Sequence, residues 1–122
     1  RGLRTLRPDR KLRAAALAHS RDMVERDFFE HVSPDGVGHH ERIVRTGYRL
    51  RSSGFATGEN LATGREGNAA TPAVVVDGWL HSEGHRRNAL RPEFEEIGIG
   101  IVPRETRGGP GATYTTTFAG RD

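Results

Sequence analysis

The strongest constraint on the fold is a change in hydrophobic periodicity along the chain. Near the start, apolar residues recur at the three- and four-residue spacing of a helix. Near the end, Glu96–Val102 and Tyr114–Phe118 alternate with period two, and the linker Gly108–Gly111 between them favours an antiparallel hairpin. Helical segments first and a hairpin last predict an α+β domain in which helices pack on a small antiparallel sheet.

Two helices are expected in the first half of the chain. The first begins after Asp9, which can cap a helix, and should end near Phe29. The second covers His39–Thr46 and should stop at Gly47. The inward face of the first helix is predicted to hold a set of residues at helical spacing: Leu12, Ala15, Ala16, His19 and Met23.

A third helix is expected after a glycine-rich stretch. Residues 48–68 show no helical period, which predicts a loop around a short extended piece near Glu59. Thr71 followed by Pro72 is typical of a helix start, and Gly84 should end that helix.

Length and composition exclude several classes of protein. A chain of 122 residues fits one domain, and no apolar run approaches the ~20 residues that cross a bilayer. No cysteine is present, so packing must replace disulfides as a brace. The net charge of +3 is a small excess, and no aromatic residues interleave with the N-terminal arginines, so we expect no nucleic-acid partner.

Three segments each place a titratable residue beside turn-forming or apolar neighbours, namely His31, Glu59 and His85. A carboxylate that enters an apolar stretch, as Glu59 does, must find a partner or raise its pKa. An imidazole would serve, and both His31 and His85 are available. The alternative is that each histidine is only a hydrogen-bonded residue at the end of a helix.

Common catalytic motifs do not fit these residues. His81 and His85 stand four apart, but the zincin pattern needs glutamate directly after the first histidine, where this chain has Ser82. Gly84 would also break the helix that aligns the two rings. The glycine-rich stretch lacks the phosphate-loop and dinucleotide patterns, and no serine sits in a Gly-x-Ser-x-Gly context.

Five short motifs together resemble the CAP superfamily of cysteine-rich secretory proteins, antigen 5 and pathogenesis-related proteins, nearest to its bacterial, SCP-like extracellular branch. The resemblance spans about Leu3 to Phe118. It implies a three-layer α-β-α sandwich with a central antiparallel sheet, formed by residues 1–122 as one domain. It also implies an extracellular or cell-envelope location, and a first helix that in the family begins before the position of Arg1. The motifs are residues 18–23 (AHSRDM), 29–36 (FEHVSPDG), 58–62 (GENLA), 79–90 (WLHSEGHRRNAL) and 97–100 (IGIG).

The same resemblance implies a cavity lined by two histidines and two glutamates. By motif position, His31, Glu59 and His85 are three of them. The fourth position holds Ser82, and the adjacent Glu83 is rotated by ~100° on a helix. His31 and His85 would be the ligands of zinc or another divalent metal, although no cofactor is required.

Three functions stay open at this stage. The preferred one is a secreted, monomeric binding module for a lipid, cell-wall or protein ligand, with metal as a modulator. The second is a metal- or His/Glu-dependent hydrolase in which Glu59, His31 and His85 act on a peptide; no catalytic residue is otherwise assigned. In the third, the same residues only hold three segments together.

Overall fold

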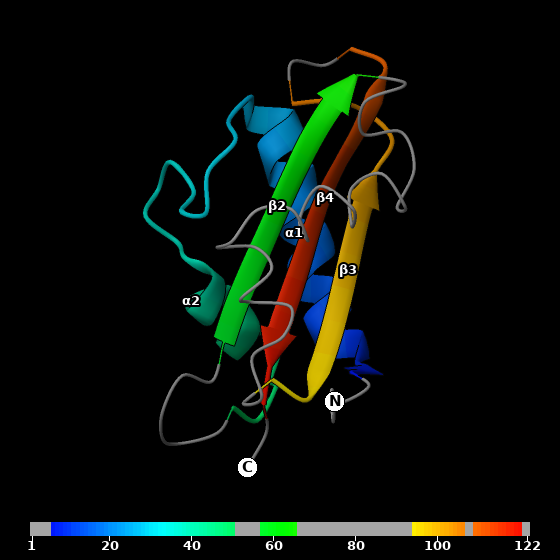
Figure 1. The fold of residues 1–122 in the computed structure, drawn as a ribbon. Helices are drawn as coiled ribbons and strands as arrows, with labels where there is room; N and C mark the ends of the chain where they lie inside the picture. Colours follow the sequence, from blue (N-terminus) through cyan, green and yellow to red (C-terminus); the bar gives the residue numbers. More distant parts are fainter. Residues whose placement is uncertain (1–5, 51–56, 66–93, 107–108, 121–122) are drawn as a thin grey trace.

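The computed structural model describes residues 6–50, 57–65, 94–106 and 109–120. Within these residues, helices α1 and α2 lie against a four-stranded sheet, as Figure 1 shows, so the predicted α+β class is confirmed. The expected helix from Thr71 to Gly84, and with it a second helical layer, falls outside these residues. The elements are β1 (Arg7–Pro8), α1 (Arg10–Arg26), α2 (His39–Arg45), β2 (Thr57–Arg65), β3 (Glu96–Val102) and β4 (Gly111–Ala119).

Both helices begin and stop close to where the sequence places them. The Asp9 carboxylate caps α1, because its Oδ2 accepts hydrogen bonds from the backbone N–H groups of Lys11 and Leu12, each at 3.0 Å. Helix α2 runs over His39–Arg45, one residue shorter than predicted, and Gly47 follows with a φ of +86°. Neither α1 nor α2 is both long and apolar enough to cross a membrane.

The end of α1 comes three residues earlier than Phe29, the predicted position. Asp27 adopts the left-handed conformation with a φ of 57°, and its backbone N–H donates to the carbonyl of Met23. The N–H of Phe28 donates to the same carbonyl at 3.1 Å. The apolar spacing continues past Arg26, but this local turn ends the helix.

Strand β4 lies in the centre of the sheet, whose order is β1-β3-β4-β2. Both β2 and β3 run antiparallel to β4, as the resemblance implies, and the predicted hairpin of β3 and β4 is confirmed. The short β1 adds a parallel pair at the edge of β3, which the sequence did not predict.

Strand β2 contains the short extended piece expected near Glu59 but is longer than expected, since it occupies Thr57–Arg65 where mostly loop was predicted. All nine of its residues pair with β4, from Thr57 opposite Ala119 to Arg65 opposite Gly111. Glycine is a poor strand former, but pairing with a central strand outweighs that local preference. Glu59 therefore lies on a regular strand.

Helix α1 packs closely on β3 because two glycines leave space for its backbone. A Cβ atom at Gly98 would overlap the backbone of Leu12 and Arg13, and one at Gly100 would overlap that of Ala16 and Leu17. The side chain of Ser20 adds a 2.9 Å hydrogen bond from its Oγ to the carbonyl of Gly100.

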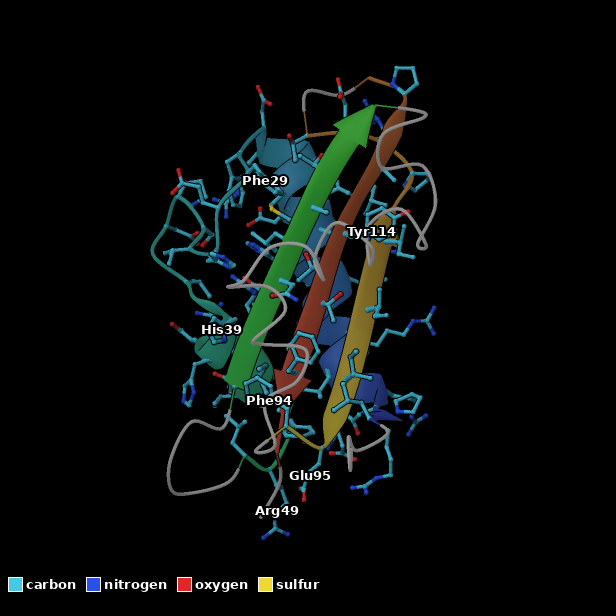
Figure 2. The ribbon with its side chains drawn as sticks, viewed as in Figure 1. Phe29, His39, Arg49, Phe94, Glu95 and Tyr114 are labelled. Atoms are coloured by element: carbon cyan, nitrogen blue, oxygen red, sulfur yellow. The ribbon has the colours of Figure 1, made fainter. Side chains whose placement is uncertain are left out.

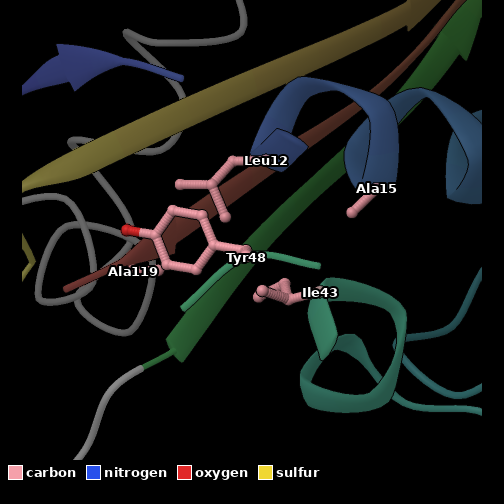
Figure 3. Close-up of a cluster of buried hydrophobic side chains, with 5 residues drawn as sticks. All are labelled: Leu12, Ala15, Ile43, Tyr48 and Ala119. Carbon is pink, nitrogen blue, oxygen red and sulfur yellow. The ribbon is translucent and has the colours of Figure 1, made fainter. Parts of the chain in front are cut away.

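A small apolar core joins both helices to the end of β4. Its members are in Figure 3 and come from α1, α2, β4 and the segment after α2. The ring of Tyr48 lies in this core, and its hydroxyl donates to Oε1 of the buried Glu96 at 2.5 Å. The core therefore fixes α2 against the sheet. Its buried residues are Leu12, Ala15, Ile43, Tyr48 and Ala119.

Replacement of Gly100 by alanine should destabilise the fold, because the added methyl group has no room beside α1. We expect Gly100→Ala to lower the free energy of unfolding by at least about 2 kcal/mol in urea denaturation. Gly38→Ala is the matched control, since its methyl group would meet no atom within 4 Å. Equal losses in the two variants would contradict the close packing of α1 on β3.

Candidate functional site

Glu59 is a carboxylate that β2 carries to the helix side of the sheet. It lies opposite Thr117, which in turn lies opposite Gly98, the residue that faces α1. Residues directly opposite one another in neighbouring strands point to the same face, so Glu59 projects towards the helices. Its side chain is 1% exposed. An ionised group buried this deeply requires partners.

The imidazole of His31 is the first of these partners. His31 lies in the segment between α1 and α2, and its Nδ1–H donates to Oε1 of Glu59 at 2.8 Å. The sequence named His31 and His85 as available partners, and the structure joins Glu59 to His31, while His85 lies outside the described residues. The His31 side chain is nevertheless 53% exposed. Its Nε2 atom forms no hydrogen bond to any residue that the structure describes.

Arg42 of α2 is the second partner, and the sequence did not predict it. Its Nη2 donates to Oε2 of Glu59 at 2.6 Å and to the backbone carbonyl of His31 at 3.0 Å. Its Nη1 donates to the carbonyl of Val37 at 2.9 Å. The guanidinium thus joins β2 to both halves of the segment between the helices. We refer to His31, Glu59 and Arg42 as the His31 cluster.

The turn after His31 has the conformation that its sequence predicts. The N–H of Gly36 donates to the carbonyl of Ser33 at 2.8 Å, and Gly36 has a φ of +87°. The hydroxyl of Ser33 donates to Asp35, which also accepts a bond from Arg26 of α1. These contacts lower the pKa of Asp35 to about 2. They tie the turn to α1.

Charge and hydrogen bonding shift the pKa values inside the His31 cluster. Burial alone would raise the pKa of Glu59, but the hydrogen bond from His31 and the charge of Arg42 together hold it below its usual value. The hydrogen bond to Glu59 raises the pKa of His31 above its ordinary value, against the effect of partial burial. The hydrogen bond between the two side chains therefore stabilises the ionised form of Glu59 and the protonated form of His31.

Both pKa shifts stabilise the folded protein, but their contributions depend on pH in opposite directions. The raised pKa of His31 contributes stability below about pH 6.5, which is lost as the pH rises through the folded-state value. The lowered pKa of Glu59 contributes stability above about pH 4.5, which is lost as the pH falls through its folded-state value.

Two further histidines lie near the same carboxylate. His19 of α1 is fully buried and donates from Nε2 to the carbonyl of Glu30 at 2.8 Å. His39 of α2 lies beside β2 in Figure 2. Burial lowers the pKa of both rings, while the charge of Glu59 acts in the other direction. The Nδ1 atom of each is buried and has no hydrogen-bond partner among the residues that the structure describes. Burial therefore disfavours the charged form of both rings.

A groove of about 520 Å³ runs between α1, the turn and α2. Small side chains such as Ala15 and Ala18 line it, together with His19 and Arg42. His31 and Glu59 do not line this groove, so it differs from the His/Glu cavity that the resemblance implies. Arg42 both lines the groove and bonds to Glu59.

Several predicted site residues cannot be placed. Ser82, Glu83 and His85 all lie outside the described residues, so a cavity shared with His31 stays a prediction.

Within the ranges given above, no group of three or more His, Asp or Glu side chains could hold a metal ion. The structure therefore gives the zinc expectation no support. Both oxygens of Glu59 are taken, and one of them bonds to the cationic Arg42.

The position of Arg42 in the sequence is an indirect indication of its role. Arg42 stands directly before Ile43, an inward residue of the predicted second helix, and three residues after His39, so Arg42 and His39 are neighbours on the helix surface. A buried carboxylate also calls for a cation. On a short helix, however, an arginine usually indicates a solvated face. His19 was assigned correctly to the inner face of α1, but nothing in the sequence connected it with Glu59.

The comparisons with known proteins agree with this fold. The sequence profile of the cysteine-rich secretory protein family, CAP, matches residues 1–118. The chain therefore belongs to the CAP family. It is 35% identical over 120 residues to the uncharacterized protein YkwD of Bacillus subtilis, and the match covers 98% of this chain. The chain spans only 41% of the length of that relative.

Solved bacterial structures show the same domain. An extracellular protein with an SCP domain from Bacillus anthracis superposes with a TM-score of 0.79 and 29% identity. That match covers 98% of this chain and 35% of the other. An outer surface protein from Borrelia burgdorferi superposes with a TM-score of 0.77 at 22% identity, over 98% of this chain and 80% of the other, which shows the fold alone.

Replacement of Glu59 by glutamine should lower the pKa of His31, because glutamine can accept the hydrogen bond but carries no charge. An NMR titration of the histidine rings measures this shift directly. The free energy of unfolding should fall more at pH 6 than at pH 8, where His31 is less protonated. Glu41→Gln on α2 is the control, since Glu41 is exposed and pairs with Arg45. An unchanged His31 titration in Glu59→Gln would contradict the assigned coupling.

Proposed function

We propose that this domain is a secreted binding module that takes its ligand at the His31 cluster. One observation carries the proposal. The buried Glu59 holds the exposed His31 ring through Nδ1, so that the second ring nitrogen, Nε2, is available to a ligand. A donor held in place in advance loses little conformational entropy on binding. An extracellular or cell-envelope location is supported by the similar Bacillus anthracis protein, which is described as extracellular.

Apolar side chains next to His31 in sequence support a ligand with an apolar part. Phe29 is 44% exposed and Val32 is 51% exposed. A lipid, a cell-wall component or a partner protein could cover them while it bonds to His31. Ser82 and His85 remain proposed members of the same site. We propose that the module acts as a monomer and without nucleic acid.

Binding fits the His31 cluster better than hydrolysis with Glu59 as the base. A general base needs a free lone pair and a pKa near the working pH. Glu59 has both oxygens engaged and a lowered pKa. Among the residues that the structure describes, no hydroxyl group bonds to His31, so the cluster includes no activated nucleophile there.

One observation supports the alternative that the domain is a hydrolase. Glu59 orients His31 through Nδ1, which is the relation between the carboxylate and the imidazole of a hydrolytic triad. If the domain were a hydrolase, His31 would be the base and Glu59 the residue that orients it. This reverses the role that the sequence suggested for Glu59.

Loss of the His31 ring should weaken binding. We expect the full chain to sediment with Bacillus subtilis cell-wall sacculi or with phosphatidylglycerol–phosphatidylethanolamine vesicles. His31→Ala should reduce that affinity by about tenfold, the effect of one lost charge-assisted hydrogen bond. His40→Ala, which removes an exposed histidine of α2, should bind like the parent. The melting temperatures of the parent and of His31→Ala are compared as well, because a purely structural role of His31 would lower the melting temperature without changing the affinity. Equal binding by the two variants would reject His31 as the contact.

Turnover assays address the alternative. A fluorogenic peptide library should show no cleavage by the parent above that of Glu59→Gln or His31→Ala at pH 7. Cleavage that both substitutions abolish, with the fold intact by circular dichroism, would favour a hydrolase instead.

A further inference from the structure

The outer edge of β3 is covered only along its first residues. In the sheet order β1-β3-β4-β2, the neighbour on that side is the short β1, which pairs with Glu96 and Ile97. Figure 1 shows β1 beside the beginning of β3, while the rest of β3 continues past it. Among the residues that the structure describes, no strand pairs with the outer edge of residues 98–102. On the opposite side of the sheet, by contrast, α2 lies against β2.

The backbone groups at this edge are arranged for hydrogen bonds with a further strand. The carbonyl of Ile97 accepts a bond from the N–H of Asp9 at 3.0 Å, so it points away from β4. Backbone groups of alternate residues in a strand point the same way, and the N–H and C=O of Ile99 and Ile101 therefore point outward as well. None of these four groups bonds to any residue in the described part of the chain. Such a row of donors and acceptors is a template for another extended chain.

The same edge lacks the features that usually protect an exposed strand. Charged side chains, prolines and bulges normally prevent pairing at such an edge. Residues 97–102 contain no charge and no proline, and their register with β4 is continuous. Ile99 and Ile101 are 43% and 42% exposed. They lie on the face away from α1, because Gly98 and Gly100 face that helix.

A pocket of about 290 Å³ lies beside the end of β3, on the face that α1 covers. Leu17 and Val24 of α1 form its apolar wall together with Val102 of β3. Arg21 and Glu25 of α1 also line it, so charges of both signs are present. Side chains of an added strand would point alternately to the two faces of the sheet. One set would lie beside the exposed isoleucines, and the other would enter this pocket.

A second copy of the chain does not fit this edge. Two β3 strands in an antiparallel pair would lie about 4.8 Å apart. Because α1 lies directly on Gly98 and Gly100 of β3, the two α1 helices would come closer than the roughly 8–10 Å that helix packing requires. A single extended segment carries no helix and avoids this overlap.

We propose that the outer edge of β3 binds an extended, uncharged peptide segment of a partner protein, which adds to the sheet as a further strand. The main chain of the segment bonds to Ile99 and Ile101, and its apolar side chains contact these isoleucines and the pocket beside α1. Main-chain bonds supply affinity without strong selection for sequence. This surface does not depend on the proposed function, since β4 separates it from β2, the strand that carries Glu59.

The test uses the full chain labelled with nitrogen-15 and a synthetic peptide of alternating threonine and valine, five residues long, with a lysine at each end for solubility. The backbone amide signals of Ile99 and Ile101 are followed by NMR as the peptide is added, and they should shift saturably. Their hydrogen exchange should slow about tenfold at a peptide concentration of about ten times the dissociation constant. The fully N-methylated peptide is the matched control, because it keeps the side chains but has no backbone N–H donors, and it should cause neither change.

Substitutions at Ile101 separate main-chain pairing from side-chain contact. Ile101→Pro removes one outward N–H and should weaken peptide binding about tenfold, while an edge strand tolerates proline at such a position. Ile101→Val keeps the N–H and a β-branched side chain, and its affinity should stay within about twofold of the parent. Val44→Ala, at an exposed apolar residue of α2, is the control for general loss of apolar surface and should bind like the parent.

Three results would overturn the inference. The first is that the amide signals of Ile99 and Ile101 do not respond to the peptide, and the second is an equal response to the N-methylated peptide. The third is a chain that dimerises through this edge in sedimentation velocity without any peptide. All three are judged on the parent, so the test stands even if Ile101→Pro does not fold. The proposed function fails separately, when binding to sacculi and vesicles does not depend on His31.

Discussion

The buried carboxylate of Glu59 is the constraint that links the fold to the site. A charge removed from water must be neutralised and hydrogen-bonded, and here the partners come from two other elements of the chain. His31 and Arg42 meet both requirements, one at each carboxylate oxygen. The segment between the helices is consequently shaped by an interaction with a strand that comes later in the sequence. The positions of β2, α2 and this segment depend on one another.

The sheet determines where that interaction can form. Because α1 rests directly on the glycines of β3, the space for other side chains on that face lies towards β2, where α2 covers the edge. Glu59 reaches this space because β2 pairs with β4 along its whole length. The apolar core that includes Tyr48 then holds α2 at the distance at which Arg42 can bond to the carboxylate of Glu59. Close backbone packing in one place thus supports a polar cluster in another.

The features that the sequence predicts well are those with local causes. The cap at Asp9, the turn before Gly36 and the alternating strands of the hairpin each depend on a few adjacent residues, and the structure contains all three. The length of strand β2 was underestimated because its stability comes from a distant partner. For the same reason the sequence could show that Glu59 needs a partner, but not that Arg42 is one of them. Arg42 was missed because a charged residue on a short helix ordinarily faces water.

The pairing of β2 with β4 also has a consequence for the order in which the protein folds. Glu59 lies opposite Thr117, almost half of the chain away, so the carboxylate reaches its final place only after this long-range ladder closes. Contacts of such large sequence separation form late, since the loop-closure entropy must be lost first. We expect helix α1 to form early from local contacts and His31 to reach Glu59 later, together with the ladder. A chain released before its C-terminal strand is made would contain the helix that precedes the site but not the site itself.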